Sequence, residues 1–139
     1  EGAVAVAAEK LKEAGARRCI PLSVSGPFHS AMLKEAGEKL GKVLEQVELR
    51  AFSTPYVTNV TAEYVTEPSE IKELLGRQVY SSVKWQQSVE RMIADGVDTF
   101  IEIGPGRTLT GFLRKINRDV KGYNIRTYEE MHQVCETLL

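Results

Sequence analysis

The fold class is decided by one stretch, Thr99–Gly106, with the sequence TFIEIGPG. Its first five residues are apolar or β-branched apart from a single glutamate, which predicts a strand buried in a parallel sheet. Gly-Pro-Gly ends the strand, and apolar residues then recur at helical spacing, at Leu109, Phe112, Leu113 and Ile116. We interpret the turn as structural, because it lacks the Lys-Ser/Thr pair of a phosphate loop. Anion binding at the helix start is the alternative.

Helices and strands are predicted to alternate along the rest of the chain, which favours a layered α/β domain. Before this stretch we expect a helix over 4–15, a strand over 17–22, a helix from Ser30, extended pieces at 49–52 and 56–60, and helices over 71–79 and 85–93. After it we expect a strand at 122–126 and a last helix, capped by Thr127 with Glu130 three residues later, that buries Met131, Val134, Cys135 and Leu138.

The helix after Ser30 is the most regular of these elements. It carries an apolar stripe that we expect in the core, made of Met32, Leu33, Ala36, Leu40, Val43, Leu44 and Val47. Charged residues occupy its other faces and are interpreted as solvated. The role of such a stripe would be to fix the direction of the residues just before the helix.

Composition narrows the class of protein. A chain of 139 residues is enough for one domain, and its net charge of −1 argues against nucleic-acid binding. No apolar run approaches the roughly 18 residues of a membrane span, so we expect no membrane partner. The use of cysteine fits a reducing cytoplasm, which is the location that we expect. Cys19 and Cys135 lack metal-ligand spacing and are expected to be buried thiols. We expect no metal and no cofactor.

His29 is the residue best placed for chemistry. It follows a small-residue loop, Ser23–Phe28, in which Gly26-Pro27 breaks the preceding extended run. The helix that begins at Ser30 puts the imidazole at a helix N-terminus, which favours the neutral form that a general base needs. The alternative interpretation is a helix cap or a pocket-lining residue.

Four blocks together resemble the malonyl-CoA:acyl carrier protein transacylases of bacterial fatty acid synthesis. They are Pro21–Leu33 around His29, Thr58–Ala62, Gln78–Trp85 and Phe100–Gly111, in the order and approximate spacing of that family. The resemblance implies an α/β hydrolase-like acyltransferase domain with an inserted ferredoxin-like subdomain. Residues 1–22 would be a remnant of the small subdomain, and residues 23–139 the C-terminal part of the large one. The family's enzymes are about twice as long, so the chain would correspond to their C-terminal half.

The resemblance also assigns roles. His29 would be the general base, with its Nδ1–H bonded to the main-chain carbonyl of Gln78, in a Ser–His dyad. The nucleophilic serine of a G-x-S-x-G elbow is not in this sequence and would lie in the N-terminal half. Phe28, beside the histidine, and Asn59 would contribute to substrate binding. For Asn59 the residues themselves favour a turn-making asparagine.

The implied reaction is malonyl transfer from malonyl-CoA to the phosphopantetheine thiol of acyl carrier protein through a seryl ester. Acyl carrier protein is acidic, so a basic docking surface is expected, with Lys84, Arg107 and Arg114 as candidates and ordinary surface charges as the alternative. Two other interpretations stay open. The chain could come from the acyltransferase domain of a polyketide or type I fatty acid synthase, or it could be a noncatalytic fragment.

Overall fold

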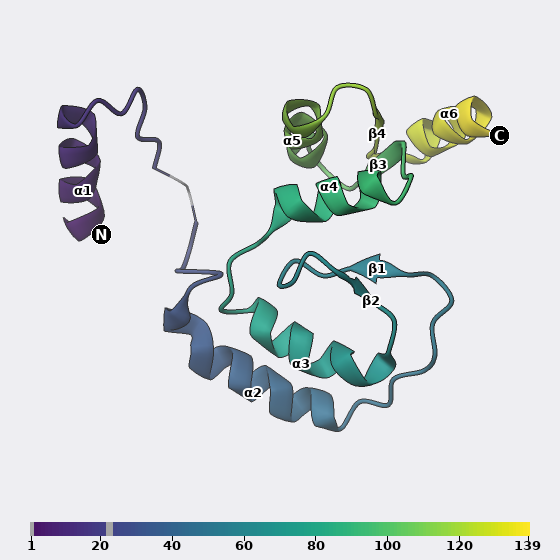
Figure 1. Ribbon diagram of the computed structural model, residues 1–139, viewed down its shortest axis with the longest axis horizontal. Coiled ribbons are helices and arrows are strands. Elements are labelled where there is room, and N and C mark those ends of the chain that lie inside the picture. The colour runs from purple at the N-terminus through teal and green to yellow at the C-terminus, as the bar shows by residue number, and fades with distance from the viewer. Residues whose placement is uncertain (1, 22–23) are drawn as a thin grey trace.

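A computed structural model describes residues 2–21 and 24–139 of the chain. The elements in order are α1 (Gly2–Glu13), a 3-10 turn η1 (Ala31–Leu33), α2 (Lys34–Glu45), β1 (Tyr56–Val57), β2 (Tyr64–Val65), α3 (Pro68–Gln78), α4 (Trp85–Ala94), β3 (Thr99–Ile103), α5 (Thr108–Ile116), β4 (Lys121–Ile125) and α6 (Tyr128–Leu138). This mixed α/β order confirms the predicted α/β class, whereas the hydrolase-like domain and the ferredoxin-like remnant stay predictions. Figure 1 shows α1 standing apart from the other elements.

The strand predicted at 17–22 is wrong over its described part, residues 17–21, which form no strand. The segment instead turns back on α1, where the Ala16 N–H donates to Leu11 O at 2.9 Å and Cys19 Sγ lies 3.5 Å from Ala8 O. A strand needs a neighbouring strand to take up its backbone hydrogen bonds. The only strand pairs of the described ranges are β1–β2 and β3–β4, and neither reaches this segment.

α2 and α3 lie side by side and run antiparallel (Figure 1), and they contact each other extensively. Gly37 is the buried residue of α2, and Gly76 is the buried residue of α3. The apolar stripe predicted as core is therefore wrong, because none of its residues is buried. Leu33, Leu40 and Leu44 are half-buried, and Met32, Ala36, Val43 and Val47 are exposed. Glycine backbones make the closest contact, and the large side chains flank it or face outward.

The segment between α2 and α3 holds a short antiparallel hairpin. β1 pairs with β2, with Tyr56 opposite Val65 and Val57 opposite Tyr64. Residues 49–52, predicted as extended, form no strand, and the piece predicted at 56–60 is a strand only over its first two residues. The rest of it is a tight turn in which the Ala62 N–H donates to Thr58 O at 2.9 Å.

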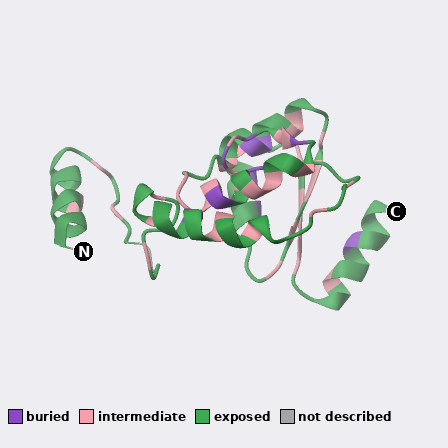
Figure 2. Ribbon diagram, turned by 90° about the horizontal axis from the view of Figure 1, so that it is seen from below, coloured by how far each residue is buried: buried purple, intermediate pink, exposed green. Residues whose placement is uncertain are grey.

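The C-terminal region is a parallel β3–α5–β4 unit, as the Thr99–Gly106 stretch predicts. β3 and β4 pair in parallel, from Thr99 opposite Lys121 to Ile103 opposite Ile125. On α4 and α5, Val89 is fully buried and Leu113 is 4% exposed; the other buried apolar residues of the described ranges are Val60, Ala62 and Val65 of the hairpin region and Val134 of α6. Figure 2 shows the buried segments mostly in the central part of the molecule, with one on the helix that ends at the C-terminus. Because α5 crosses from one strand to its parallel neighbour, its N-terminus lies at the carboxyl end of β3.

Several apolar side chains predicted as buried are open. Ile103 of β3 is 79% exposed, and on α6 only Val134 is buried, whereas Met131, Cys135 and Leu138 are exposed. The expectation of two buried thiols is also wrong, because Cys19 is half-buried and Cys135 is exposed. A parallel sheet is normally covered on both faces. Within the described ranges nothing covers the Ile103 side of β3.

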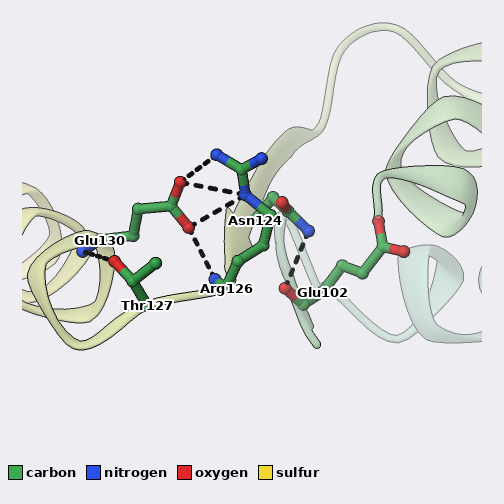
Figure 3. A network of polar contacts seen from close by, with 5 residues as sticks. All are labelled: Glu102, Asn124, Arg126, Thr127 and Glu130. Carbon is green, nitrogen blue, oxygen red and sulfur yellow. Dashed lines mark hydrogen bonds and ion pairs between the residues drawn. The ribbon is translucent and has the colours of Figure 1, made fainter. Parts of the chain in front are cut away.

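The cap of α6 is confirmed. The Glu130 N–H donates to Thr127 Oγ1 at 3.3 Å, and the Glu130 carboxylate turns back to accept from the Arg126 N–H at 2.6 Å and to pair with the Arg126 guanidinium (Figure 3). These contacts hold the pKa of Glu130 down at about 2, chiefly through the hydrogen bonds from Arg126. Among the described residues, no helix has the length and apolar content to cross a bilayer.

Candidate functional site

His29 lies in the loop that leads into η1, with its side chain exposed and its backbone in the left-handed region at φ +58°. Non-glycine residues adopt this conformation rarely, and it persists where surrounding contacts impose it. Two contacts do so here. The His29 main-chain N–H donates to Val79 O at 3.2 Å, and its Nδ1 lies 2.9 Å from Gln78 O.

The Gln78 contact fixes the tautomer of the imidazole. A carbonyl oxygen can only accept, so Nδ1 must carry the proton and donate it. Nε2 then keeps its lone pair and is free to take a proton from another group. The structure thus contains the hydrogen bond that the family resemblance predicted from Gln78, and the contact comes from the main chain.

Both acceptors lie at the C-terminal end of α3, where Gln78 is the last helical residue and Val79 the C-cap. The last carbonyls of a helix have no intrahelical partner. They also carry the partial negative charge of the helix dipole, which stabilises a cation at that end. The end of α3 therefore presents its free carbonyls to the Nδ1 side of the His29 ring.

Loop geometry delivers His29 to this helix end. Ser30 Oγ donates to Pro27 O at 2.6 Å, and the Leu33 N–H donates to Ser30 O at 3.0 Å, which closes the loop around the histidine. Phe28 precedes His29 and is 60% exposed, so it can be reached from solvent beside the ring. No described residue closes over the two side chains to exclude water.

Asn59 lies in the tight turn after β1, as the turn interpretation expects. Its main-chain carbonyl accepts from the Lys84 N–H at 2.9 Å. This contact ties the turn to the α3–α4 connection, residues 79–84, whose first residue accepts the hydrogen bond from the His29 N–H. The structure therefore links Asn59 and His29 through one short segment, without a direct contact between them.

The start of α5 is occupied by an acidic side chain that the sequence analysis did not single out. The Glu102 carboxylate accepts from the Leu109 N–H at 3.1 Å, the Thr110 N–H at 2.8 Å and Thr110 Oγ1 at 2.6 Å. The Thr110 contacts lower the pKa of Glu102. Figure 3 shows this carboxylate directed away from Asn124, which binds the Glu102 carbonyl instead.

Glu102 decides between the two interpretations of the Gly-Pro-Gly turn. An anion bound at a helix start uses the first free N–H groups of the helix. At α5 two of these groups already bind a carboxylate of the same chain. The structural interpretation of the turn is thus favoured. The available signal in the sequence was an acid near the end of the strand with a threonine just inside the next helix.

The three candidate docking cations are exposed. Arg107 and Arg114 line a cavity of about 290 Å³ with Tyr123 and Asn124 at the junction of α5 and β4. Neither these arginines nor Lys84 is in an ion pair with any residue of the described ranges. Lys84 lies apart from them, at the start of α4.

Comparison with known proteins places this geometry in context. No family model matches the chain. The malonyl CoA-acyl carrier protein transacylase of Bacillus subtilis is 45% identical over 135 residues, which is 97% of this chain and 43% of that protein. The transacylase of the same name from Staphylococcus aureus is 46% identical over 88% of this chain and 40% of its own length.

Solved structures agree with these relatives. The acyl-carrier-protein-S-malonyltransferase of Bartonella henselae superposes with a TM-score of 0.89 at 37% identity, over 99% of this chain and 44% of that one. A malonyl-transacylase solved in complex with a type II polyketide synthase acyl-carrier protein superposes with a TM-score of 0.92 at 36% identity. The match covers 99% of this chain and 44% of that one. The chain spans less than half the length of the curated relatives it matches. It is therefore homologous, along nearly all of its own length, to one part of the malonyl CoA-acyl carrier protein transacylases, consistent with their C-terminal portion.

Proposed function

We propose that the whole protein to which this chain belongs transfers a malonyl group from malonyl-CoA to the phosphopantetheine thiol of acyl carrier protein, and that His29 is its general base. The observation that carries the proposal is the 2.9 Å contact between His29 Nδ1 and Gln78 O. It fixes the proton on Nδ1 and leaves Nε2 as the basic atom. The similarity to transacylases supports the substrate class.

The reaction follows as two acyl transfers. His29 Nε2 takes the proton of a serine hydroxyl in the rest of the protein while the serine oxygen attacks the thioester carbonyl. The carbon–sulfur bond breaks, and the imidazolium returns its proton to the departing coenzyme A thiolate. In the second transfer, Nε2 takes the proton of the carrier thiol, the sulfur attacks the seryl ester, and the proton returns to the serine oxygen.

The helix end lowers the barrier by stabilising the charge that His29 acquires. In each half-reaction the ring becomes a cation, and its Nδ1–H already points at the C-terminal carbonyl of α3. A neutral carbonyl stabilises that cation less than an aspartate would, but the bond is formed before the reaction and needs no reorganisation. The backbone donors for the oxyanion and the group that binds the malonyl carboxylate would lie in the rest of the protein, as the resemblance implies. Phe28 and Asn59 remain proposed contributors to substrate binding.

The partner in the second transfer would dock on cations. Arg107 and Arg114 on α5, and Lys84 at the start of α4, are exposed and without ion pairs in the described part of the chain. Charge pairs at the rim of an interface act mainly on the association rate and are screened by salt. Reversal of Arg114 to glutamate should raise the KM for acyl carrier protein at low salt and leave the KM for malonyl-CoA unchanged.

The experiment uses a chimera in which this chain replaces the matching segment of the Bacillus subtilis relative, to which it is 45% identical. Loss of a general base costs about 10²- to 10⁴-fold in rate. His29→Ala should therefore reduce malonyl transfer by that factor. His132→Ala is the matched control, since His132 is the other histidine of the chain and is exposed on α6. Equal activity of the two variants would refute the base role.

The chain alone should behave differently from the chimera. The sequence has no serine in a G-x-S-x-G elbow, so we propose that the isolated 139-residue chain forms no acyl-enzyme. Incubation with labelled malonyl-CoA, followed by denaturation, tests this directly. Label that stays covalently bound to the isolated chain would contradict the proposed division of roles.

A further inference from the structure

Gly37 and Gly76 make a backbone-to-backbone contact that leaves no room for a side chain. A Cβ atom built on Gly37 would lie 2.5 Å from Gly76 O and 2.6 Å from a ring carbon of Tyr80. Built on Gly76, it would lie 3.2 Å from Gly37 O. A Cβ atom built on Gly41, one turn further along α2, would have no other atom within 4 Å. The tight approach is therefore local to the first half of α2 and the second half of α3.

This contact lies close in sequence to the His29 site on both sides. Gly37 is in the first turn of α2, the helix that follows His29 after η1. Gly76 is two residues before Gln78, and Tyr80 directly follows Val79. The main-chain carbonyls of Gln78 and Val79 accept the two hydrogen bonds from His29. The imidazole therefore precedes one of the two helices, and its acceptors end the other.

We propose that Gly37 is a positioning residue for His29. Its missing side chain lets α2 approach α3 closely enough for the Nδ1–H to reach Gln78 O, and Gly76 completes the contact from the other helix. The inference rests on the proposed function, since it gives His29 the role of base. It adds a residue that acts through the imidazole without touching substrate.

The expected size of the effect follows from the contact distances. Ordinary van der Waals contact begins near 3.4 Å, so alanine at position 37 would push the helices apart by about 0.9 Å at the backbone of Gly76. The Tyr80 ring can rotate, but the Gly76 carbonyl is part of the helix and cannot. If His29 moves with α2, the Nδ1···O distance rises from 2.9 Å to about 3.8 Å, beyond hydrogen-bond reach.

Three single variants form a graded series in the chimera. Gly41→Ala is the matched control, because it adds the same methyl group to the same helix where nothing lies within 4 Å. Gly76→Ala makes a moderate contact at 3.2 Å and Gly37→Ala a severe one at 2.5 Å. We expect kcat to fall in that order: within about twofold for Gly41→Ala, and by about 10- to 100-fold for Gly37→Ala. The KM for malonyl-CoA should change little.

A second readout separates positioning from general loss of packing. A long-range ¹H–¹⁵N spectrum reports which imidazole nitrogen carries the proton, and the His29 signals are those missing from the His29→Ala spectrum. The Nδ1–H form should dominate in the parent chimera and in Gly41→Ala. Gly37→Ala should give a mixture of tautomers, while the His132 signals stay unchanged.

The outcomes distinguish the inference from the proposed function. If His29→Ala abolishes transfer and Gly37→Ala matches Gly41→Ala in kcat and in tautomer, the positioning role is wrong and the base role stands. If His29→Ala has no effect, the proposed function itself fails. Should Gly37→Ala fail to fold, the comparison passes to Gly76→Ala, where wild-type kcat with an unchanged Nδ1–H signal would overturn the inference.

Discussion

A methyl group on His29 Nδ1 is the sharpest perturbation of the proposed base. Nδ1-methylhistidine at position 29 keeps the Nε2 lone pair but cannot donate to Gln78 O, which lies 2.9 Å from Nδ1. A methyl carbon about 1.5 Å from the nitrogen would lie about 1.4 Å from that oxygen, so the ring must move by more than 1 Å. A displacement of about 1 Å at a reacting group can cost about 10²-fold in rate.

The hydrogen bond itself adds to this loss. A bond to a charged group contributes about 1.5 kcal/mol at the low end of its range, the end suited to an exposed ring, and this equals about tenfold. We therefore expect kcat of the chimera to fall by 100-fold or more, measured as malonyl transfer to carrier protein. Gln78→Ala should stay within about twofold, because the main-chain carbonyl remains.

Two controls make the result interpretable. Nδ1-methylhistidine at position 132, where the exposed ring packs edge-on against Tyr128 at 4.5 Å, should leave kcat unchanged. Wild-type kcat with the modified residue at position 29 would refute the role of the Nδ1 bond. A loss of activity in Gln78→Ala as large as in the methylated protein would show that the glutamine side chain, and not its carbonyl, is needed.

Leu113 is only 4% exposed, so Leu113→Ala should lower the free energy of unfolding of the chimera by about 2–5 kcal/mol, measured by urea denaturation. The control Leu139→Ala, at a fully exposed residue, should change it by less than about 0.5 kcal/mol. Glu130 should stabilise α6 fully above its unfolded pKa of about 4.3 and lose that contribution as the pH falls through its folded pKa of about 2. The difference in thermal midpoint between the parent and Glu130→Gln should therefore shrink as the pH falls from about 4 to about 2 and vanish below about pH 2. A difference that stays constant down to pH 2 would contradict this. Thr110→Val removes the hydroxyl that is the largest cause of the lowered pKa of Glu102, so an NMR titration should find that pKa moved upward toward the ordinary carboxyl value, and an unchanged pKa would show that the hydroxyl bond does not matter.

Local patterns predicted most of the helices and both strands of the parallel pair. The Thr99–Ile103 strand was predicted with its observed bounds, and the Thr127 cap of α6 was identified with its partner Glu130. Both depend on residues close in sequence, through strand propensity and a side chain that reaches three residues along the chain. Such elements could be predicted because all the residues that determine them lie close together in the sequence.

The failures concern pairing and burial, which depend on distant partners. Residues 17–21 have the composition of a strand but find no neighbour, and Ile103 is apolar yet open because nothing in the described ranges covers it. A hydrophobic pattern says which face seeks burial, not whether another segment is present to cover it.

The candidate site also has features that the sequence predicted and features that it did not. The loop before α2 identified His29 by its residues, and the family resemblance pointed to the carbonyl of Gln78, 49 positions away. The backbone contact of His29 with Val79 and the glycine contact between α2 and α3 were not predicted, because neither involves a side chain that a motif could display. Backbone acceptors and missing side chains become visible only when the helices are placed in space.

The central claim is that His29 removes the proton from the nucleophile, and the first half-reaction tests it most directly. In a single turnover, labelled malonyl-CoA is mixed with the chimera and the rate of covalent labelling is measured before any carrier protein is added. We expect His29→Ala to slow this labelling by about 10²- to 10⁴-fold relative to His132→Ala. Labelling at the same rate in both variants would mean that another group activates the serine.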